Sequence, residues 1–308
     1  MEKITVFEEE GLYRDPFVIT GFRFGSGQKS VCVVGTMRGT ENQQLYCCSQ
    51  LVKRLKQVEE QGELAPGHEI MVIPCVNPYS LNTKMRFWGI DNTDINRMFP
   101  GYDKGETTQR IAAGVFEAVK DYEYGIQFTS FYRPGSFVPH VRMMKTGYEN
   151  TDLACEFGMP YVIIRNPRPY DTTTLNYNWQ IWETQAFSIY TTQTEVLDKA
   201  SAADAIDAIL RFLTRRGILT GSYIEGQISR VVDATHLCPI RSKAAGFFTP
   251  LVPVGSFVRA GTTLAHITDP LDGSLLEKIT SPVDGTIIFT HNEPLTYAAT
   301  AVFKVCMI

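Results

Sequence analysis

Residues 29–35 read KSVCVVG and residues 69–77 read EIMVIPCVN. Both runs are rich in β-branched and other apolar residues, a pattern typical of strands buried on both faces of a sheet. Between them, apolar residues recur every three or four positions from Glu41 and stop before Gly62, which predicts an amphipathic helix. A strand, a helix and a second strand in this order predict a parallel pair with a right-handed crossover, and therefore an α/β fold.

The alternation of strand and helix patterns continues through the first two thirds of the chain. A second helix is expected at residues 106–120, and a third from Ser201, with Asp204 as its cap, to Gly217. Further strands are expected at residues 124–131, 160–165 and 186–192. The pattern predicts an α/β domain over residues 1–220, with a parallel or mixed sheet and flanking helices.

The pattern changes after residue 220. Short β-type runs alternate with Gly, Pro and Asp, and no helical period is left in this part of the sequence. Residues 221–308 are therefore expected to form a small all-β domain. This domain is expected to pack over the rim of the site or to support contacts between subunits, so a homo-oligomer is possible.

The composition is that of an ordinary globular protein. The chain has 308 residues, of which 44% are hydrophobic and 20% charged, and its formal net charge is -4. It has no basic stripe for nucleic acid, no signal-peptide pattern and no apolar run long enough to cross a membrane. The seven cysteines, with Cys47 and Cys48 adjacent, show no disulfide spacing. These features predict a cytoplasmic protein with no nucleic-acid or membrane partner.

The loop after the second predicted strand is the densest in groups that carry chemistry. Residues 78–101 hold Arg86, Asn96 and Arg97 at the carboxyl end of that strand, where sites lie in open α/β sheets. The arginine fork matches a carboxylate or phosphate, and an adjacent amide can orient it. The alternative is a solvated loop whose arginines pair with its own aspartates, Asp91 and Asp94.

These residues resemble the signature of a known family. Asn77 and Pro78, then Arg86, then DINRMFPG at residues 94–101 are similar to the motifs of the succinylglutamate desuccinylase/aspartoacylase family. The resemblance implies a carboxypeptidase-like α/β fold with a barrel-sandwich-like all-β domain after it. It also implies a zinc-dependent hydrolase, or deacylase, that acts on N-acyl amino acids.

The zinc site that the resemblance implies is incomplete in this sequence. The family has His-Gly-Asp/Asn-Glu in the first turn, where His and Glu bind zinc, and this chain has Arg38-Gly39-Thr40-Glu41. Only Glu41 matches a ligand position. The third ligand position falls on Phe128, and the position of the general-base glutamate falls on Tyr190.

Neither replacement at a ligand position can bind a metal. Phe128 has no donor atom, and the Arg38 guanidinium stays protonated. A cation about 4 Å from a divalent ion costs about 8 kcal/mol at an effective dielectric constant of 20. The sequence therefore predicts no metal and no cofactor. Arg38 and Glu41 are expected to form an ion pair in place of the metal, with Phe128 as an apolar wall.

By the same resemblance, the substrate-binding positions are intact. Arg86 matches the arginine that polarises the scissile carbonyl, and Asn96 and Arg97 match the pair that holds the free carboxylate. One hypothesis is a pseudoenzyme without zinc that binds a small carboxylated ligand such as an N-acyl amino acid. The alternative is an active amide hydrolase that uses a rearranged zinc site or metal-free acid–base chemistry. In that alternative His140 acts as the base or joins Glu41 on zinc; otherwise His140 is a hydrogen-bonded wall residue.

Residues 171–183, DTTTLNYNWQIWE, combine polar and aromatic side chains. One interpretation is a loop over the ligand, lined by Tyr177, Trp179 and Trp182. The other is a surface hairpin whose aromatic side chains pack on the core.

Overall fold

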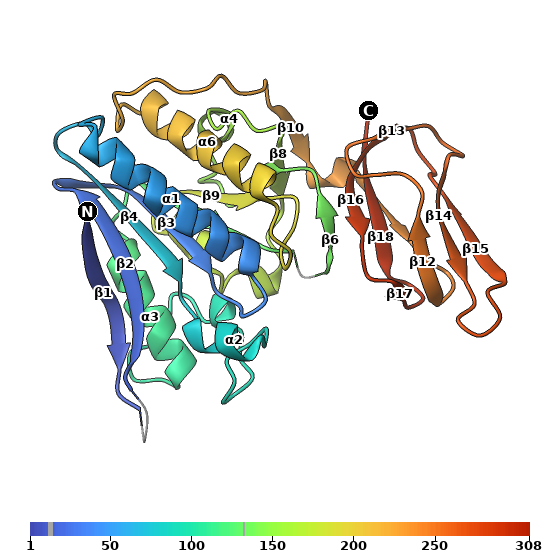
Figure 1. Ribbon diagram of the computed structural model, residues 1–308, viewed down its shortest axis with the longest axis horizontal. Coiled ribbons are helices and arrows are strands. Elements are labelled where there is room, and N and C mark those ends of the chain that lie inside the picture. The colour runs from blue at the N-terminus through green and yellow to red at the C-terminus, as the bar shows by residue number, and fades with distance from the viewer. Residues whose placement is uncertain (12–14, 132) are drawn as a thin grey trace.

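The computed structural model describes residues 1–11, 15–131 and 133–308. In these residues nine strands form one mixed sheet in the order β1-β2-β4-β3-β5-β9-β7-β8-β10 (Figure 1). Their bounds are β1 (Glu2–Glu9), β2 (Phe17–Gly25), β3 (Gln28–Thr36), β4 (His68–Cys75), β5 (Tyr124–Phe128), β7 (His140–Met144), β8 (Tyr161–Arg165), β9 (Gln185–Tyr190) and β10 (Arg230–Asp233). The predicted α/β fold with a mixed sheet is confirmed.

The helices lie on both faces of the sheet. The α-helices are α1 (Asn42–Glu60), α2 (Pro78–Thr83), α3 (Thr107–Val119), α4 (Thr151–Cys155), α5 (Leu175–Ile181) and α6 (Lys199–Arg215). The short 3-10 helices are η1 (Ile95–Arg97), η2 (Pro169–Asp171) and η3 (Ala234–His236). Helices α1 and α6 pack in one buried cluster, and α3 and α5 pack in the cluster on the opposite face.

The predicted strand–helix–strand unit is confirmed as β3, α1 and β4. Strands β3 and β4 are parallel, with Val33 opposite Val72. Alternate residues of β3 face opposite clusters: Val33 packs on the side of α1, and Cys32 on the side of α3. A strand buried on both faces must be apolar throughout, which explains the unbroken run VCVV in its sequence.

Two local predictions are wrong. Helix α6 begins at Lys199, and its cap is Asp198, whose carboxylate accepts from the backbone N–H of Ser201 at 3.0 Å; Asp204 is not the cap. Residues 171–183 form neither a loop nor a hairpin, because they contain helix α5. Trp179 is fully buried and donates from Nε1 to the carbonyl of Val119 at 3.1 Å, so it belongs to the core.

The second part of the chain is all β, as predicted. Sheet β11-β18-β16-β13 and sheet β15-β14-β12-β17 are antiparallel and share one buried cluster. Their bounds are β11 (Leu237–Arg241), β12 (Gly246–Pro250), β13 (Phe257–Val258), β14 (Thr263–Thr268), β15 (Leu275–Thr280), β16 (Gly285–His291), β17 (Leu295–Thr296) and β18 (Ala301–Met307).

The two parts exchange short strands where they meet. Strand β6 (Gly135–Phe137) leaves the first part and pairs with β16, as Figure 1 shows between the two bodies. Conversely, β10 follows residue 220 in sequence but pairs with β8 of the large sheet. The domain boundary between residues 220 and 221 stays a prediction. The shared strands hold β18 near the first domain.

Candidate functional site

The turn after β3 is fixed by a close backbone approach at Gly39. Its N–H donates to the carbonyl of Met85 at 3.0 Å. A Cβ at this position would lie 1.9 Å from the carbonyl oxygen of Ser80 and 2.3 Å from that of Met85, so only glycine fits. The contact holds the segment that carries Arg86 against the turn that carries Arg38.

The Glu41 carboxylate is surrounded by hydrogen-bond donors. Its Oε2 accepts from the backbone N–H of Met37 at 2.8 Å and of Arg38 at 3.1 Å. Its Oε1 accepts from the Arg38 Nη1 at 3.0 Å and from the hydroxyl of Ser130. The predicted ion pair between Arg38 and Glu41 is therefore confirmed, and both side chains are almost completely buried.

Arg38 also binds a carboxylate from the following loop. Its Nε and Nη2 donate to Oδ2 of Asp94 at 3.0 and 2.9 Å. Burial alone would lower the pKa of the Arg38 guanidinium, but Glu41 and Asp94 outweigh burial and raise that pKa above its ordinary value. Asp94 is thus paired with an arginine outside its own loop, and the two carboxylates hold Arg38 as a permanent cation.

The predicted carboxylate-binding residues lie in the same loop as Asp94, at η1. Asn96 is buried, and its Oδ1 accepts from the N–H of Leu175 at 3.1 Å. Arg97 donates from Nη1 to the carbonyl of Tyr170 at 2.8 Å and lies 3.6 Å from Oδ1 of Asp171. The Arg97 side chain is 32% exposed. The Arg86 guanidinium lies 5.5 Å from the ring centre of Phe87.

The side chains of Phe128 and Ser130, two residues apart, have different surroundings. Phe128 ends β5 and belongs to the buried cluster that contains residues of α1 and α6. Its partner in the register is Ile189, so Phe128 and Tyr190 point to opposite faces of the sheet. The contact from this segment to the Arg38–Glu41 pair comes from Ser130, which sequence reasoning missed. A small polar residue two positions after a buried strand is the signal that could have found it.

Tyr190 and His140 lie opposite each other, at the end of β9 and the start of β7. Their rings are stacked, with centres 4.7 Å apart and planes 3° apart. The His140 Nδ1 pairs with the carbonyl of Val138 at 2.8 Å, while Nε2 and the Tyr190 hydroxyl have no hydrogen-bond partner within the described part of the chain. Burial first, and then the nearby charges of Arg142 and Lys304, together lower the pKa of His140 to about 3. The imidazole is therefore neutral at physiological pH.

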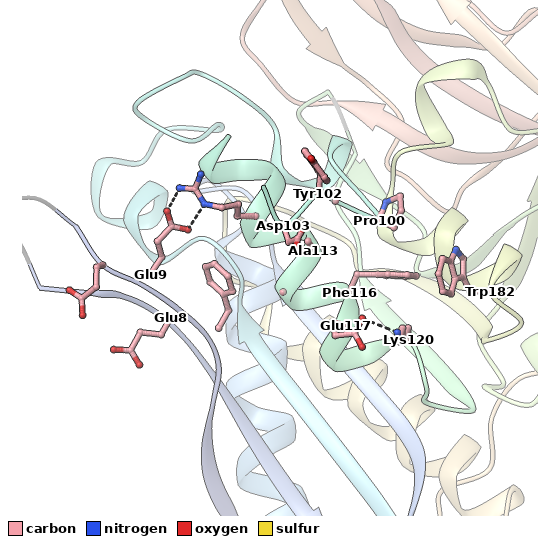
Figure 2. A pocket seen from close by; sticks show the side chains of 15 residues that line it. Glu8, Glu9, Pro100, Tyr102, Asp103, Ala113, Phe116, Glu117, Lys120 and Trp182 are labelled. Atoms are coloured by element: carbon pink, nitrogen blue, oxygen red, sulfur yellow. Dashed lines mark hydrogen bonds and ion pairs between the residues drawn. The ribbon is translucent and has the colours of Figure 1, made fainter. Parts of the chain in front are cut away.

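A separate hollow lies along the outer side of α3 (Figure 2). Its lining includes Glu9, Tyr102 and Trp182, one of the aromatic residues predicted to line a ligand. It includes none of the predicted positions Arg38, Glu41, Arg86, Asn96, Arg97, Phe128, His140 and Tyr190. Two of its cations are paired: Arg110 with Glu9, and Lys120 with Glu117 at 2.8 Å. The hollow is thus separate from the Arg38–Glu41 pair.

The fold and the turn after β3 define a carboxypeptidase-like α/β protein with an all-β appendage. Residues 27–214 match the succinylglutamate desuccinylase/aspartoacylase catalytic domain, and the chain belongs to this family of N-acyl amino acid deacylases. No curated protein matches the sequence. None of the described helices is both long enough and apolar enough to span a bilayer.

Several solved structures share the fold over nearly the whole chain. A succinylglutamate desuccinylase from a Silicibacter species is 18% identical, with a TM-score of 0.80 over 99% of this chain and 93% of that one. A succinylglutamate desuccinylase/aspartoacylase from Rhodobacter sphaeroides is 19% identical, with a TM-score of 0.78 over 95% and 89%. The product-bound ectoine utilization protein EutE (DoeB) from Ruegeria pomeroyi is 19% identical, with a TM-score of 0.79 over 95% and 90%. At these identities the likeness is one of fold.

Proposed function

We propose that this chain is a zinc-free member of its family. It binds a small carboxylate-bearing ligand, such as an N-acyl amino acid, through Arg86, Asn96 and Arg97, with little or no hydrolysis. The observation that carries the proposal is the buried ion pair between Arg38 and Glu41, with Nη1 and Oε1 3.0 Å apart.

The donors around Glu41 do not fit a zinc ion. A catalytic zinc ion takes three protein ligands and needs lone pairs directed at it. Here both oxygens of Glu41 already accept hydrogen bonds, and one of the donors is a guanidinium. A zinc ion beside that guanidinium would meet a repulsion of about 8 kcal/mol at an effective dielectric constant of 20. Because Arg38 is also fixed by Asp94, turning it away would break a second ion pair.

The binding half of the proposal rests on the loop at η1. Asn96 uses its Oδ1 to hold the start of α5, which leaves the Nδ2 donors for a ligand carboxylate. The partly exposed guanidinium of Arg97 lies on the next residue. The relative from Ruegeria pomeroyi was solved with its product bound, which supports a ligand-binding role for this fold.

The alternative, a metal-free hydrolase with His140 as its base, is less well supported. A general base works best when its pKa lies near the pH of the reaction. Burial lowers the pKa of His140 to about 3, and its Nδ1 is held by the carbonyl of Val138. These contacts support the wall interpretation of His140.

Metal content and ligand binding test the two halves separately. Elemental mass spectrometry on protein purified without a metal-affinity step is expected to find no stoichiometric zinc, and near-stoichiometric zinc would refute the first half. Calorimetry with a panel of N-acetyl amino acids is expected to show binding that Arg97→Ala weakens at least tenfold. Arg54→Ala, an exposed arginine on α1, is the matched control. Equal binding by both variants would refute the second half.

A further inference from the structure

Two cations from different domains meet at one aromatic ring. The ammonium of Lys304, on β18, lies 4.5 Å from the ring centre of Phe131. The guanidinium of Arg142, on β7, lies 5.6 Å from the same centre and 4.4 Å from that of Tyr190. Neither cation has a carboxylate within ion-pair distance among residues 1–11, 15–131 and 133–308.

The surroundings of these two cations add positive charge instead of cancelling it. Burial first, and then the charges of four arginines, with Arg142 the strongest of them, together lower the pKa of Lys304 to about 8. The carboxylate that acts on Arg142, Asp171, is already bound to Arg165 at 2.7 Å. Half-buried cations without counter-charges are costly, so this arrangement calls for an anion that the chain itself does not supply.

Tyr190 adds a neutral donor at the same place. Its side chain is 1% exposed, and its hydroxyl has no hydrogen-bond partner among the described residues. The charges of Arg142 and Arg165 both act on this hydroxyl and lower its pKa, against burial, which raises it. A buried hydroxyl normally has a partner, so the unused O–H is a second and independent sign of a ligand.

We propose that Lys304, Arg142 and the Tyr190 hydroxyl form a site between the two domains for a compact oxyanion with two negative charges. A phosphate and a small dicarboxylate share this chemistry. Two negative charges are needed because a single one leaves one of the two cations uncompensated. The site does not rest on the carboxylate-binding residues Asn96 and Arg97.

The proposal gives the second domain a direct role. Strand β18 lies beside β16, which pairs with β6 of the first domain, so this connection holds Lys304 next to Phe131. An anion bound by both cations would join the two domains through charge as well as through the β6–β16 pairing. Its binding is therefore expected to raise the midpoint of thermal unfolding.

The test is titration of the whole chain with phosphate and with succinate at constant ionic strength, with acetate as the monovalent comparison. Saturable binding of phosphate or succinate is expected, and acetate is expected to bind at least tenfold more weakly. Tighter binding of phosphate would identify a tetrahedral anion, and tighter binding of succinate a dicarboxylate. The absence of saturable binding by both would overturn the proposal.

Variants locate the bound anion. Lys304→Gln and Arg142→Gln are expected to weaken binding at least tenfold, whereas Lys278→Gln, an exposed lysine on β15, is expected to leave it unchanged. Equal binding by all three variants would overturn the site. Arg142 lies in the sheet, so Arg142→Gln can impair folding. Nuclear magnetic resonance of the wild-type protein therefore gives a second test. Phosphate is expected to raise the pKa of Lys304; no change at Lys304 would contradict the proposal.

Arg97→Ala separates this site from the proposed function. The variant is expected to lose binding of N-acetyl amino acids and to retain binding of phosphate or succinate. Loss of both would show that there is one shared site and would overturn the separate anion site. Loss of anion binding in Lys304→Gln alone would leave the proposed function intact.

Discussion

The Arg38 cluster and the Arg142–Lys304 cluster differ in how their charge is balanced. Arg38 donates to Glu41 and Asp94 and has a raised pKa. Arg142 and Lys304 contact aromatic rings and have lowered pKa values. The charges of Arg38 and Arg142 both lower the pKa of Tyr190, against the effect of burial.

Burial acts in the same direction on the cations of both clusters, since it disfavours the charged form. What differs is the supply of carboxylates from the chain. The Arg38 cluster is complete in itself, which is what a structural ion pair needs. The Arg142–Lys304 cluster is incomplete, which is what a binding site for an anion needs. Charge balance therefore separates a role in stability from a role in recognition more clearly than the presence of arginine does.

The largest expected effect on stability comes from removing a charge from the Arg38 cluster. Glu41→Gln removes one counter-charge of Arg38 and weakens the acceptor for two backbone N–H groups. We expect the free energy of unfolding to fall by about 3–5 kcal/mol, as is typical when one partner of a buried pair is removed. Urea denaturation measures the effect. Glu117→Gln, at an exposed ion pair on α3, is the control and is expected to cause no measurable change. A loss below about 1 kcal/mol at Glu41 would show that the pair does not stabilise the fold.

A smaller loss of stability is expected from a substitution in the turn that carries Arg38 and Glu41. In Gly39→Ala the new Cβ meets the carbonyl oxygens of Ser80 and Met85, and backbone atoms yield less easily than side chains. We expect a loss of about 2–3 kcal/mol in the free energy of unfolding, from overpacking. Gly89→Ala, where a Cβ meets no atom within 4 Å, is the matched control. If both variants unfold at the same urea concentration, the close approach at Gly39 does not constrain the turn.

The Arg38 cluster was largely predictable from sequence, because its central contact is local. Arg38 and Glu41 are three residues apart in one turn, and opposite charges at that spacing can meet whatever the rest of the chain does. The β3–α1–β4 unit was equally predictable, since its periodicity is local and strong. Asp94 and Ser130 were not assigned to this cluster, because only the packing of three separate loops on the sheet edge brings them to Arg38 and Glu41.

The Arg142–Lys304 cluster could not be predicted from sequence, because it depends on contacts between distant segments. Lys304 reaches Phe131 only through the pairing of β6 with β16, and no local pattern indicates a three-residue strand that joins two domains. Helix α5 was missed for a related reason. Its two asparagines have low helix propensity, and burial of Trp179 together with the cap at Thr174 stabilises the helix instead.

Without an anion, Lys304 is expected to cost stability, in contrast to Arg38. Its pKa is lowered to about 8 in the folded chain, from an ordinary 10.5, so the unfolded chain binds this proton more tightly. The cost is therefore complete below pH 8 and disappears as the pH rises above 10.5. We expect Lys304→Gln to raise the free energy of unfolding at pH 7 by about 1–2 kcal/mol, allowing for partial solvent screening.

Urea denaturation at pH 7 and pH 10, without phosphate, measures this difference. The gain from Lys304→Gln is expected to shrink at the higher pH, and Lys278→Gln is expected to show no gain at either. A loss of stability at pH 7 would mean that Lys304 has a favourable partner, and the contrast with Arg38 would fail.

The smallest expected effect is the pH dependence of anion binding. Lys304 is the group near the anion that changes charge between pH 8 and 9.5. The surrounding guanidinium groups (Arg133, Arg142, Arg165 and Arg168) stay protonated, burial raises the pKa of Tyr190, and His140, whose pKa is about 3, is already neutral. A bound dianion raises the pKa of Lys304, so by the same linkage deprotonation of Lys304 must weaken the binding of the anion. We expect the affinity for phosphate to fall about fivefold over this range, or roughly 1 kcal/mol.

Lys304→Arg keeps its charge and is expected to bind phosphate equally well at both pH values. A fivefold fall that persists in Lys304→Arg would assign the titration to another group and remove Lys304 from the site.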